Sequence, residues 1–160
     1  MKQYHLQNNI LNLQVKKTPF LVRAILFVIA FVLFIFPVVG AIFGIALGNG
    51  LHIGYFIGIG FCSLIGFYTL RVALWNTYGN ETIQILDDKV IYEANYGWFK
   101  DGKKELLVSN PNFYVVSAGY EEDNEGVLII GCDDAKVESV VKIGMIQLEE
   151  LTALLQNSKK

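Results

Sequence analysis

The chain has 160 residues, of which 53% are hydrophobic and 18% are charged, and its formal net charge is −2. A mean hydropathy of +0.42 is too high for an average soluble domain, so the composition favours a membrane protein. The slightly acidic balance argues against a nucleic-acid-binding protein, because such proteins carry a basic face or stripe.

Residues 1–19 are expected to form a cytoplasmic N-terminal tail. Within it, the segment YHLQNNILNLQV alternates apolar and polar residues on either side of two asparagines, a pattern typical of a β-hairpin. Two interpretations stay open. Either the hairpin contributes strands to a sheet built from later residues, or the segment is a frayed amphipathic tail.

Two stretches without charge follow, at residues 24–47 and 51–70, and only the sequence GNG separates them. A helix needs about 20 residues to cross the ~30 Å hydrocarbon layer, so each stretch is long enough for one transmembrane helix. We therefore predict a transmembrane hairpin within residues 20–75. A cleaved signal peptide is the alternative for the first stretch, but the apolar core of such a peptide is only about 7–15 residues long.

The basic residues of the short flanks all lie on one side of this hairpin. They are Lys2, Lys16, Lys17 and Arg23 before the first span and Arg71 after the second, and the connecting turn has none. Basic flanks stay on the cytoplasmic side of a membrane. Both termini are therefore predicted to be cytoplasmic, at the inner membrane if the protein is bacterial.

Small residues recur at every fourth position in both spans. They are Gly40, Gly44 and Gly48 in the first span and Gly54, Gly58, Cys62 and Gly66 in the second. Such faces allow helix backbones to approach closely in lipid. Two uses stay open: packing between the two helices of one chain, and self-association with a second protomer.

From residue 76 onward, apolar residues alternate with polar ones, which predicts a small antiparallel β domain at residues 76–160. Turn signals at Asp87-Asp88 and Asp101-Gly102 predict two successive hairpins. The acidic residues 121–125 are interpreted as a solvated hairpin tip rather than a calcium loop. The expected strands cover residues 81–86, 89–96, 97–100, 104–108, 112–118, 126–132 and 136–143.

The last segment is expected to be a helix that covers the sheet. It places Met145, Leu148, Leu151 and Leu155 on one stripe at helical spacing. The side chains expected in the core are Ile83, Ile85, Ile91, Phe113, Val115, Leu128, Ile130, Leu148 and Leu151.

This order of elements resembles a known family. The residues concerned are Trp75, Gly79, Ile83, Ile85, Asp88, Lys89, Val90, Tyr92, the segment YGWFK at residues 96–100 and the helix from Met145. With the two apolar spans before them, they resemble the bacterial pleckstrin-homology-like (PH-like) membrane proteins. The resemblance implies a roll or barrel of about six to eight strands with a capping helix. It implies a role in binding or membrane organisation and no catalytic residue.

The sequence offers little chemistry. His5 and His52 are predicted to lie on opposite sides of the membrane, so they cannot share a site. Zinc-ligand spacing, phosphate-binding loops and nucleophile motifs are absent from the sequence. We therefore expect no catalytic residue, no cofactor and no metal, and we expect that the protein is not an enzyme. Cys62 and Cys132 are expected to be reduced thiols.

Several residues are candidates for contact with lipid headgroups. They are Trp75 and Tyr78 after the second span, and Trp98, Lys100, Lys103 and Lys104 around a predicted turn. Aromatic rings are enriched at membrane interfaces, and lysine is attracted to anionic lipid. A solvated turn is the alternative, because three lysines are fewer than the 4–8 of a typical lipid-binding cluster.

These patterns lead to two functional hypotheses. The first is a membrane-anchored binding or scaffold module that presents a PH-like domain at the inner-leaflet surface to a protein partner. The second is a small two-span effector whose β domain senses a ligand such as a nucleotide and whose helices oligomerise to perturb the membrane. The second hypothesis needs a polar cavity of about 300 Å³ or more.

Overall fold

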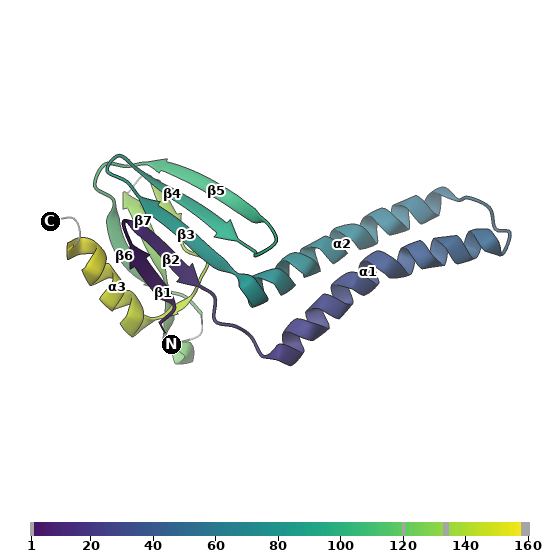
Figure 1. Ribbon diagram of the computed structural model, residues 1–160, viewed down its shortest axis with the longest axis horizontal. Coiled ribbons are helices and arrows are strands. Elements are labelled where there is room, and N and C mark those ends of the chain that lie inside the picture. The colour runs from purple at the N-terminus through teal and green to yellow at the C-terminus, as the bar shows by residue number, and fades with distance from the viewer. Residues whose placement is uncertain (1, 120, 133–134, 158–160) are drawn as a thin grey trace. The chain divides into compact units, whose positions relative to one another are not determined.

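The computed structural model describes residues 2–119, 121–132 and 135–157 of the chain (Figure 1). The chain is organised in two compact units. Lys17–Thr77 form a helical unit, and Met1–Lys16 together with Tyr78–Lys160 form a β unit. Because both ends of the chain contribute to the β unit, the helical unit is an insertion within it.

The helical unit consists of α1 (Phe20–Ala46) and α2 (Ile53–Tyr78), both long and apolar enough to cross a membrane. The prediction of two long apolar helices is confirmed. α2 differs from the predicted span because it continues past Leu70 to Tyr78, so residues 76–78, which were assigned to the β domain, are helical. The sequence has no glycine or proline between Gly66 and Gly79 that would end the helix earlier.

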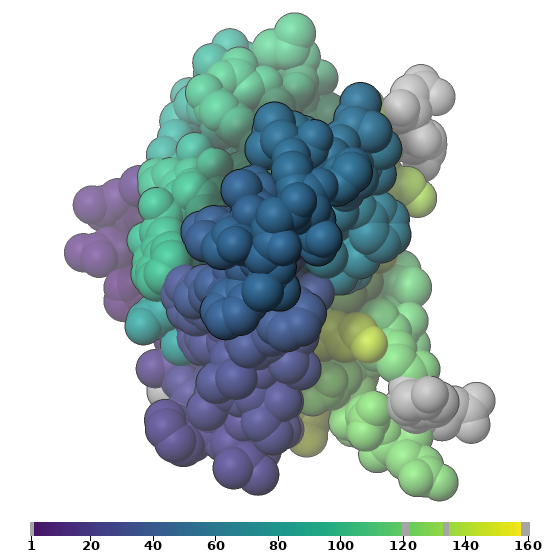
Figure 2. Space-filling view, turned by 90° about the vertical axis from the view of Figure 1, so that its right-hand side faces the viewer, coloured from purple at the N-terminus to yellow at the C-terminus, as the bar shows by residue number. Residues whose placement is uncertain are grey.

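Apolar side chains cover the surface of these helices. Figure 2 draws the surface of the hairpin in blue, and Phe36, Phe43 and Leu64 are 74%, 66% and 73% exposed. Soluble monomers rarely expose apolar patches this continuous. Lipid or another apolar partner is needed to cover this surface.

The first sheet of the β unit has five antiparallel strands in the order β1-β2-β3-β4-β5. Asn8 and Asn9 close the β1–β2 turn with φ angles of 49° and 62°, a left-handed conformation that asparagine tolerates. β2 pairs with β3 across the helical insertion, so the N-terminal segment is part of the sheet and not a frayed tail. The strands are β1 (Tyr4–Gln7), β2 (Ile10–Gln14), β3 (Asn80–Ile85), β4 (Lys89–Asn95) and β5 (Lys100–Leu107).

The turn between β4 and β5 lies earlier in the chain than predicted. Gly97 has a φ of 87°, and its amide donates a 2.8 Å hydrogen bond to the Asn95 side chain. Gly102, which was expected in a turn with Asp101, instead lies inside β5 with a φ of 66°, where the register with β4 shifts. A glycine in this conformation permits a bulge, so one long strand replaces the second predicted hairpin.

The second sheet has four strands in the order β6-β7-β8, with β9 also pairing with β7. The strand predicted at residues 136–143 is broken. The Ser139 hydroxyl accepts a 2.9 Å hydrogen bond from the Leu128 amide and donates one of 3.3 Å to the Val141 carbonyl. The Ser139 amide still donates a 2.9 Å hydrogen bond to the Leu128 carbonyl, but the regular pairing ends there and residues 139–142 belong to no strand. The elements are β6 (Asn112–Ser117), η1 (Glu121–Asp123), β7 (Glu125–Cys132), β8 (Ala135–Glu138) and β9 (Ile143–Gly144).

The predicted C-terminal helix is confirmed as α3 (Met145–Asn157), which lies against β6, β7 and β9 (Figure 1). Leu148, Leu151 and Leu155 on its inner stripe are all buried. The strands thus form two sheets closed on one side by a helix. Of the other side chains expected in the core, Ile83, Phe113, Leu128 and Ile130 are buried, and Ile85 and Val115 are half-buried.

The alternation of β4 is the reverse of the predicted one. Val90, Tyr92 and Ala94 are buried, whereas Ile91 is half-buried on the outer face of the sheet. Tyr92 faces inward because its hydroxyl has an acceptor there, the Glu81 carboxyl group at 2.9 Å. A buried hydroxyl needs such a partner, so the bond to Glu81 stabilises this orientation of the strand together with the burial of Val90 and Ala94.

Candidate functional site

The first sheet has two different ends. At one end, which we call the root end, Gln14, Asn80, Asn95 and Lys100 are neighbours across four strands. Both connections to the helical unit leave from the root end, where the Val15 amide donates a 3.1 Å hydrogen bond to the Gly79 carbonyl. The opposite end, the distal end, carries the β1–β2 turn, the β3–β4 turn and the β5–β6 connection.

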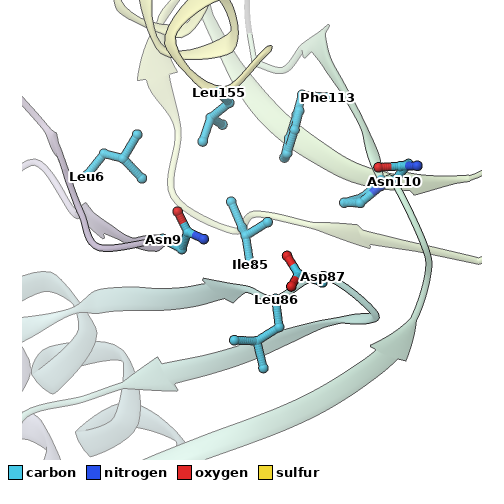
Figure 3. A pocket seen from close by; sticks show the side chains of 9 residues that line it. Leu6, Asn9, Ile85, Leu86, Asp87, Asn110, Phe113 and Leu155 are labelled. Carbon is cyan, nitrogen blue, oxygen red and sulfur yellow. The ribbon is translucent and has the colours of Figure 1, made fainter. Parts of the chain in front are cut away.

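The distal end holds a pocket of about 200 Å³ (Figure 3). Part of its lining comes from the first sheet, namely β1, the β1–β2 turn, the end of β3 and the β3–β4 turn. The rest comes from the β5–β6 connection, the start of β6 and α3. They are Leu6, Asn9, Ile85, Leu86, Asp87, Asn110, Pro111, Phe113 and Leu155.

The floor of the pocket is apolar. Figure 3 shows Ile85, Phe113 and Leu155 converging from β3, β6 and α3, while the Leu86 side chain points away from them. Phe113 and Leu155 are 7% and 1% exposed, so both are held firmly by the surrounding core. The floor is therefore held in place by core packing, and the half-buried Ile85 is its more exposed member.

The rim of the pocket is polar and acidic. Asn9 and Asn110 supply side-chain amides and Asp87 supplies a carboxylate, and the lining contains no basic residue. Within the described part of the chain, these three side chains form no hydrogen bond with another residue. Asn9 and Asn110 have φ angles of 62° and 59°, so both turns use the left-handed conformation that suits asparagine.

A second polar group, around Glu81, is closed to solvent. Glu81 is fully buried, and its Oε1 accepts hydrogen bonds from the Tyr92 hydroxyl at 2.9 Å and from the amides of Val140 and Val141 at 2.7 and 3.1 Å. Its Oε2 has no partner among the described residues. Burial raises the pKa of Glu81 to about 7, although the three hydrogen bonds oppose this shift. The group joins β3 and β4 of one sheet to the β8–β9 connection of the other, which is a structural role.

Two of the predicted membrane-interface residues, Tyr78 and Trp98, belong to the root end. Tyr78 ends α2 and lies against Gly97 of the β4–β5 turn, where a Cβ would come within 2.7 Å of the Tyr78 Cβ. Trp98 is the next residue of that turn and is 63% exposed. Trp75 lies one turn earlier in α2.

The three candidate lysines do not form one basic patch. Lys100 Nζ is 2.7 Å from Glu93 Oε2, and Lys103 Nζ is 3.1 Å from Glu105 Oε1. Lys104 pairs with Tyr92 in the register, and paired residues of neighbouring strands share a face of the sheet. Lys104 is therefore on the same face as Tyr92, whereas Lys100 and Lys103 are on the outer face. Each outer lysine thus has an acidic neighbour that offsets its charge.

The glycines of the two spans differ in their surroundings. A Cβ on Gly44 would overlap the Tyr55 ring, and one on Gly66 would lie 3.3 Å from Leu33 and Phe34. These two glycines therefore permit close packing within the helical hairpin. A Cβ would meet nothing within 4 Å at Gly40, Gly48, Gly54 and Gly58.

Among the described residues, no group of three or more His, Cys, Asp or Glu side chains could hold a metal ion. Comparison of the chain with protein-family models, curated proteins and solved structures found no match. The function is therefore inferred from the chain's own residues.

Sequence reasoning missed both the pocket and the buried carboxyl group. Asp87 was interpreted only as a turn residue, and the pocket forms only when segments distant in sequence meet at the distal end. Glu81 carried a usable signal, because alternation along β3 places it on the same face as the core residue Ile83. An acidic residue on the apolar face of a strand predicts a buried partner.

Proposed function

We propose that the chain is a membrane-anchored binding module whose β unit, of the PH-like kind that the sequence resembles, is held at the inner-leaflet surface to bind a protein partner. The main observation in support of this proposal is the pairing of β2 with β3, which bears on how the β unit is anchored. These neighbouring strands lie on either side of the helical insertion. If α1 and α2 both cross the bilayer, the pairing requires the two chain ends to be on the same side of it.

Short connections support a position close to the bilayer surface. β2 ends at Gln14 and α1 begins at Phe20, while α2 ends at Tyr78 and β3 begins at Asn80. An extended chain spans at most about 3.6 Å per residue, so the root end cannot move far from the ends of the helices. The basic flanks assign this side to the cytoplasm.

The position of the pocket also favours a binding module. The pocket lies at the distal end of the sheet, opposite the root end from which both helices leave. A strand rises about 3.3 Å per residue, so the length of β3 separates the pocket from the root end. A partner in the cytoplasm can reach the pocket without entering the headgroup layer.

The nucleotide-sensing alternative receives less support. The distal pocket, at about 200 Å³, is smaller than the roughly 300 Å³ at which small-molecule sites begin. A neighbouring hollow beside Asn112, Tyr114 and Gln156 is larger, about 420 Å³, but it is more open to solvent. The lining of the pocket is also acidic, which disfavours a phosphate group.

The anchoring is tested by the accessibility of cysteines in bacterial cells that express the full chain. Cys132 is exposed on the β unit, so a membrane-impermeant maleimide should label it only after the cells are permeabilised. The variant Cys132→Ser is the background control, and Asn49→Cys, in the turn between α1 and α2, should be labelled in intact cells. Labelling of Cys132 in intact cells would contradict the proposal.

A further inference from the structure

We propose that the distal pocket receives one basic side chain, lysine or arginine, from the protein partner. This inference rests on the proposed function, because it specifies what the anchored module recognises. The alkyl part of the side chain lies over the apolar floor, and its cationic head lies at the rim beside Asp87.

The size of the pocket favours a single side chain. About 200 Å³ is less than the roughly 300–1,000 Å³ of a small-molecule site. Long basic side chains have an apolar stem and a polar tip, and they commonly bury the stem while the tip stays hydrated. The floor of Ile85, Phe113 and Leu155 matches the stem, and the open rim leaves room for the tip.

The charge of the rim selects a cation. Among the described residues of the lining, Asp87 is the only charged one, and none of the described residues forms a hydrogen bond or an ion pair with its carboxylate. Asn9 and Asn110 also line the pocket, and each amide carries an acceptor oxygen beside its donor NH2 group. An ammonium or guanidinium group has only donors, so it suits the acceptor-only carboxylate of Asp87 better than an anion or a neutral apolar group does, and the two amide oxygens can accept further hydrogen bonds from it.

The turns that carry these groups are already braced. The Ile85 amide donates to the Asn9 carbonyl at 2.9 Å, which ties the β1–β2 turn to the end of β3. The Val108 amide donates to the Asp88 carbonyl at 3.0 Å, which ties the β5–β6 connection to the β3–β4 turn. A preformed site loses little conformational freedom on binding, which favours recognition of even one side chain.

The test uses the full chain in lipid nanodiscs and a phage library of random heptapeptides, with empty nanodiscs to remove lipid binders. The enriched peptides should share a lysine or arginine at one position. A labelled peptide from this set is then compared with its neutral analogue, in which citrulline replaces arginine or norleucine replaces lysine. Loss of a charge-assisted hydrogen bond should weaken binding to the wild-type chain by about tenfold or more.

The variant Asp87→Asn decides whether the pocket is responsible. This variant should bind the basic peptide about tenfold more weakly than wild type, and it should no longer distinguish that peptide from the neutral analogue. Asp88→Asn removes the same charge one residue away but outside the lining, so it should behave as wild type. Asn110→Gly, which keeps the left-handed conformation and removes the amide, should weaken binding less than Asp87→Asn.

Three results would overturn the inference. In the first, no peptide is enriched over empty nanodiscs, and in the second, the enriched peptides share no basic residue. In the third, wild type and Asp87→Asn distinguish the basic peptide from its neutral analogue equally well. The topology of the anchor is measured separately through Cys132, so a failure of the pocket can be distinguished from a failure of the proposed function.

Discussion

The Tyr92 hydroxyl donates a 2.9 Å hydrogen bond to Glu81 Oε1, and both side chains are buried between the two sheets. The same oxygen accepts hydrogen bonds from the amides of Val140 and Val141 in the β8–β9 connection of the second sheet. One carboxyl group therefore connects elements that regular strand pairing does not join. Because its other oxygen is buried without a partner among the described residues, the charged form of Glu81 is poorly stabilised.

This arrangement predicts that the β unit becomes less stable as the pH rises through the titration of Glu81. Burial raises the pKa of Glu81 from 4.5 to about 7, so between these values the folded state binds more protons than the unfolded state. The free energy of unfolding should fall by about 3 kcal/mol from pH 4.5 to pH 7 and then level off. Denaturant unfolding at several pH values measures this change.

The matched variants are Glu81→Gln and Glu93→Gln. Glu81→Gln keeps an acceptor oxygen for the Tyr92 hydroxyl and the amides of Val140 and Val141, but it removes the ionisable carboxyl group. The unfolding free energy of this variant should therefore vary less with pH than that of wild type. Glu93→Gln changes an ion-paired carboxylate on the outer face of the sheet and should keep the wild-type slope. An unchanged slope in Glu81→Gln would show that Glu81 does not ionise in this range.

The helices and several strands could be predicted from the sequence because their signals are local. α1, α2 and α3 each show a long apolar run or a helical stripe, and β7 matches an apolar segment bounded by turn residues. The β4–β5 turn was misplaced because Gly97 and Gly102 both carry turn signals, and only the pairing with β4 decides between them. Local patterns do not contain that pairing.

The candidate site depends on contacts between distant segments. The bonding of Glu81 to the amides of Val140 and Val141 could not be predicted from alternation, although the inward position of Glu81 could. The distal pocket is harder still to predict, because Asn9, Asp87 and Asn110 each occupy an ordinary turn. Their common location follows only from the antiparallel order that places all three turns at one end.

A comparison of Gly97 and Gly102 tests the contact between the root end and the end of α2. Both glycines have positive φ angles, 87° and 66°, so alanine at either position is strained by about 1–2 kcal/mol. At Gly97 the added Cβ would also come within 2.7 Å of Tyr78, whereas at Gly102 it would meet nothing within 4 Å. Gly97→Ala should therefore lower the unfolding free energy more than Gly102→Ala. Equal losses would argue against the contact with Tyr78.

The position of Trp98 tests whether the root end lies at the headgroup layer. The chain has two tryptophans, and Trp75→Phe leaves Trp98 as the only one. If the root end lies at the surface, lipids brominated near the headgroups should quench Trp98 fluorescence more than lipids brominated deep in the acyl chains. No quenching by either lipid would place the β4–β5 turn away from the membrane.

The lysines of the same region should contribute little to lipid attraction. Lys100 and Lys103 lie beside Glu93 and Glu105, and exposed ion pairs of this kind leave little net charge for the bilayer. Changing Lys100, Lys103 and Lys104 together to Gln should therefore leave the quenching of Trp98 nearly unchanged in membranes with and without anionic lipid. The full chain is required, because the isolated residues 77–160 would lack β1 and β2. A strong dependence on these lysines would restore lipid binding as the role of the turn.

The last prediction concerns α3, which covers the second sheet and supplies Leu155 to the distal pocket. Leu151 is fully buried, so Leu151→Ala should lower the unfolding free energy by about 2–5 kcal/mol through lost contacts and the cavity left behind. Leu154 is 45% exposed on the same helix, so Leu154→Ala should lower it by much less. Denaturant unfolding of both variants in nanodiscs provides the comparison. Equal effects at the two positions would mean that α3 does not cover the sheet through this stripe, and the floor of the pocket would then lack its support.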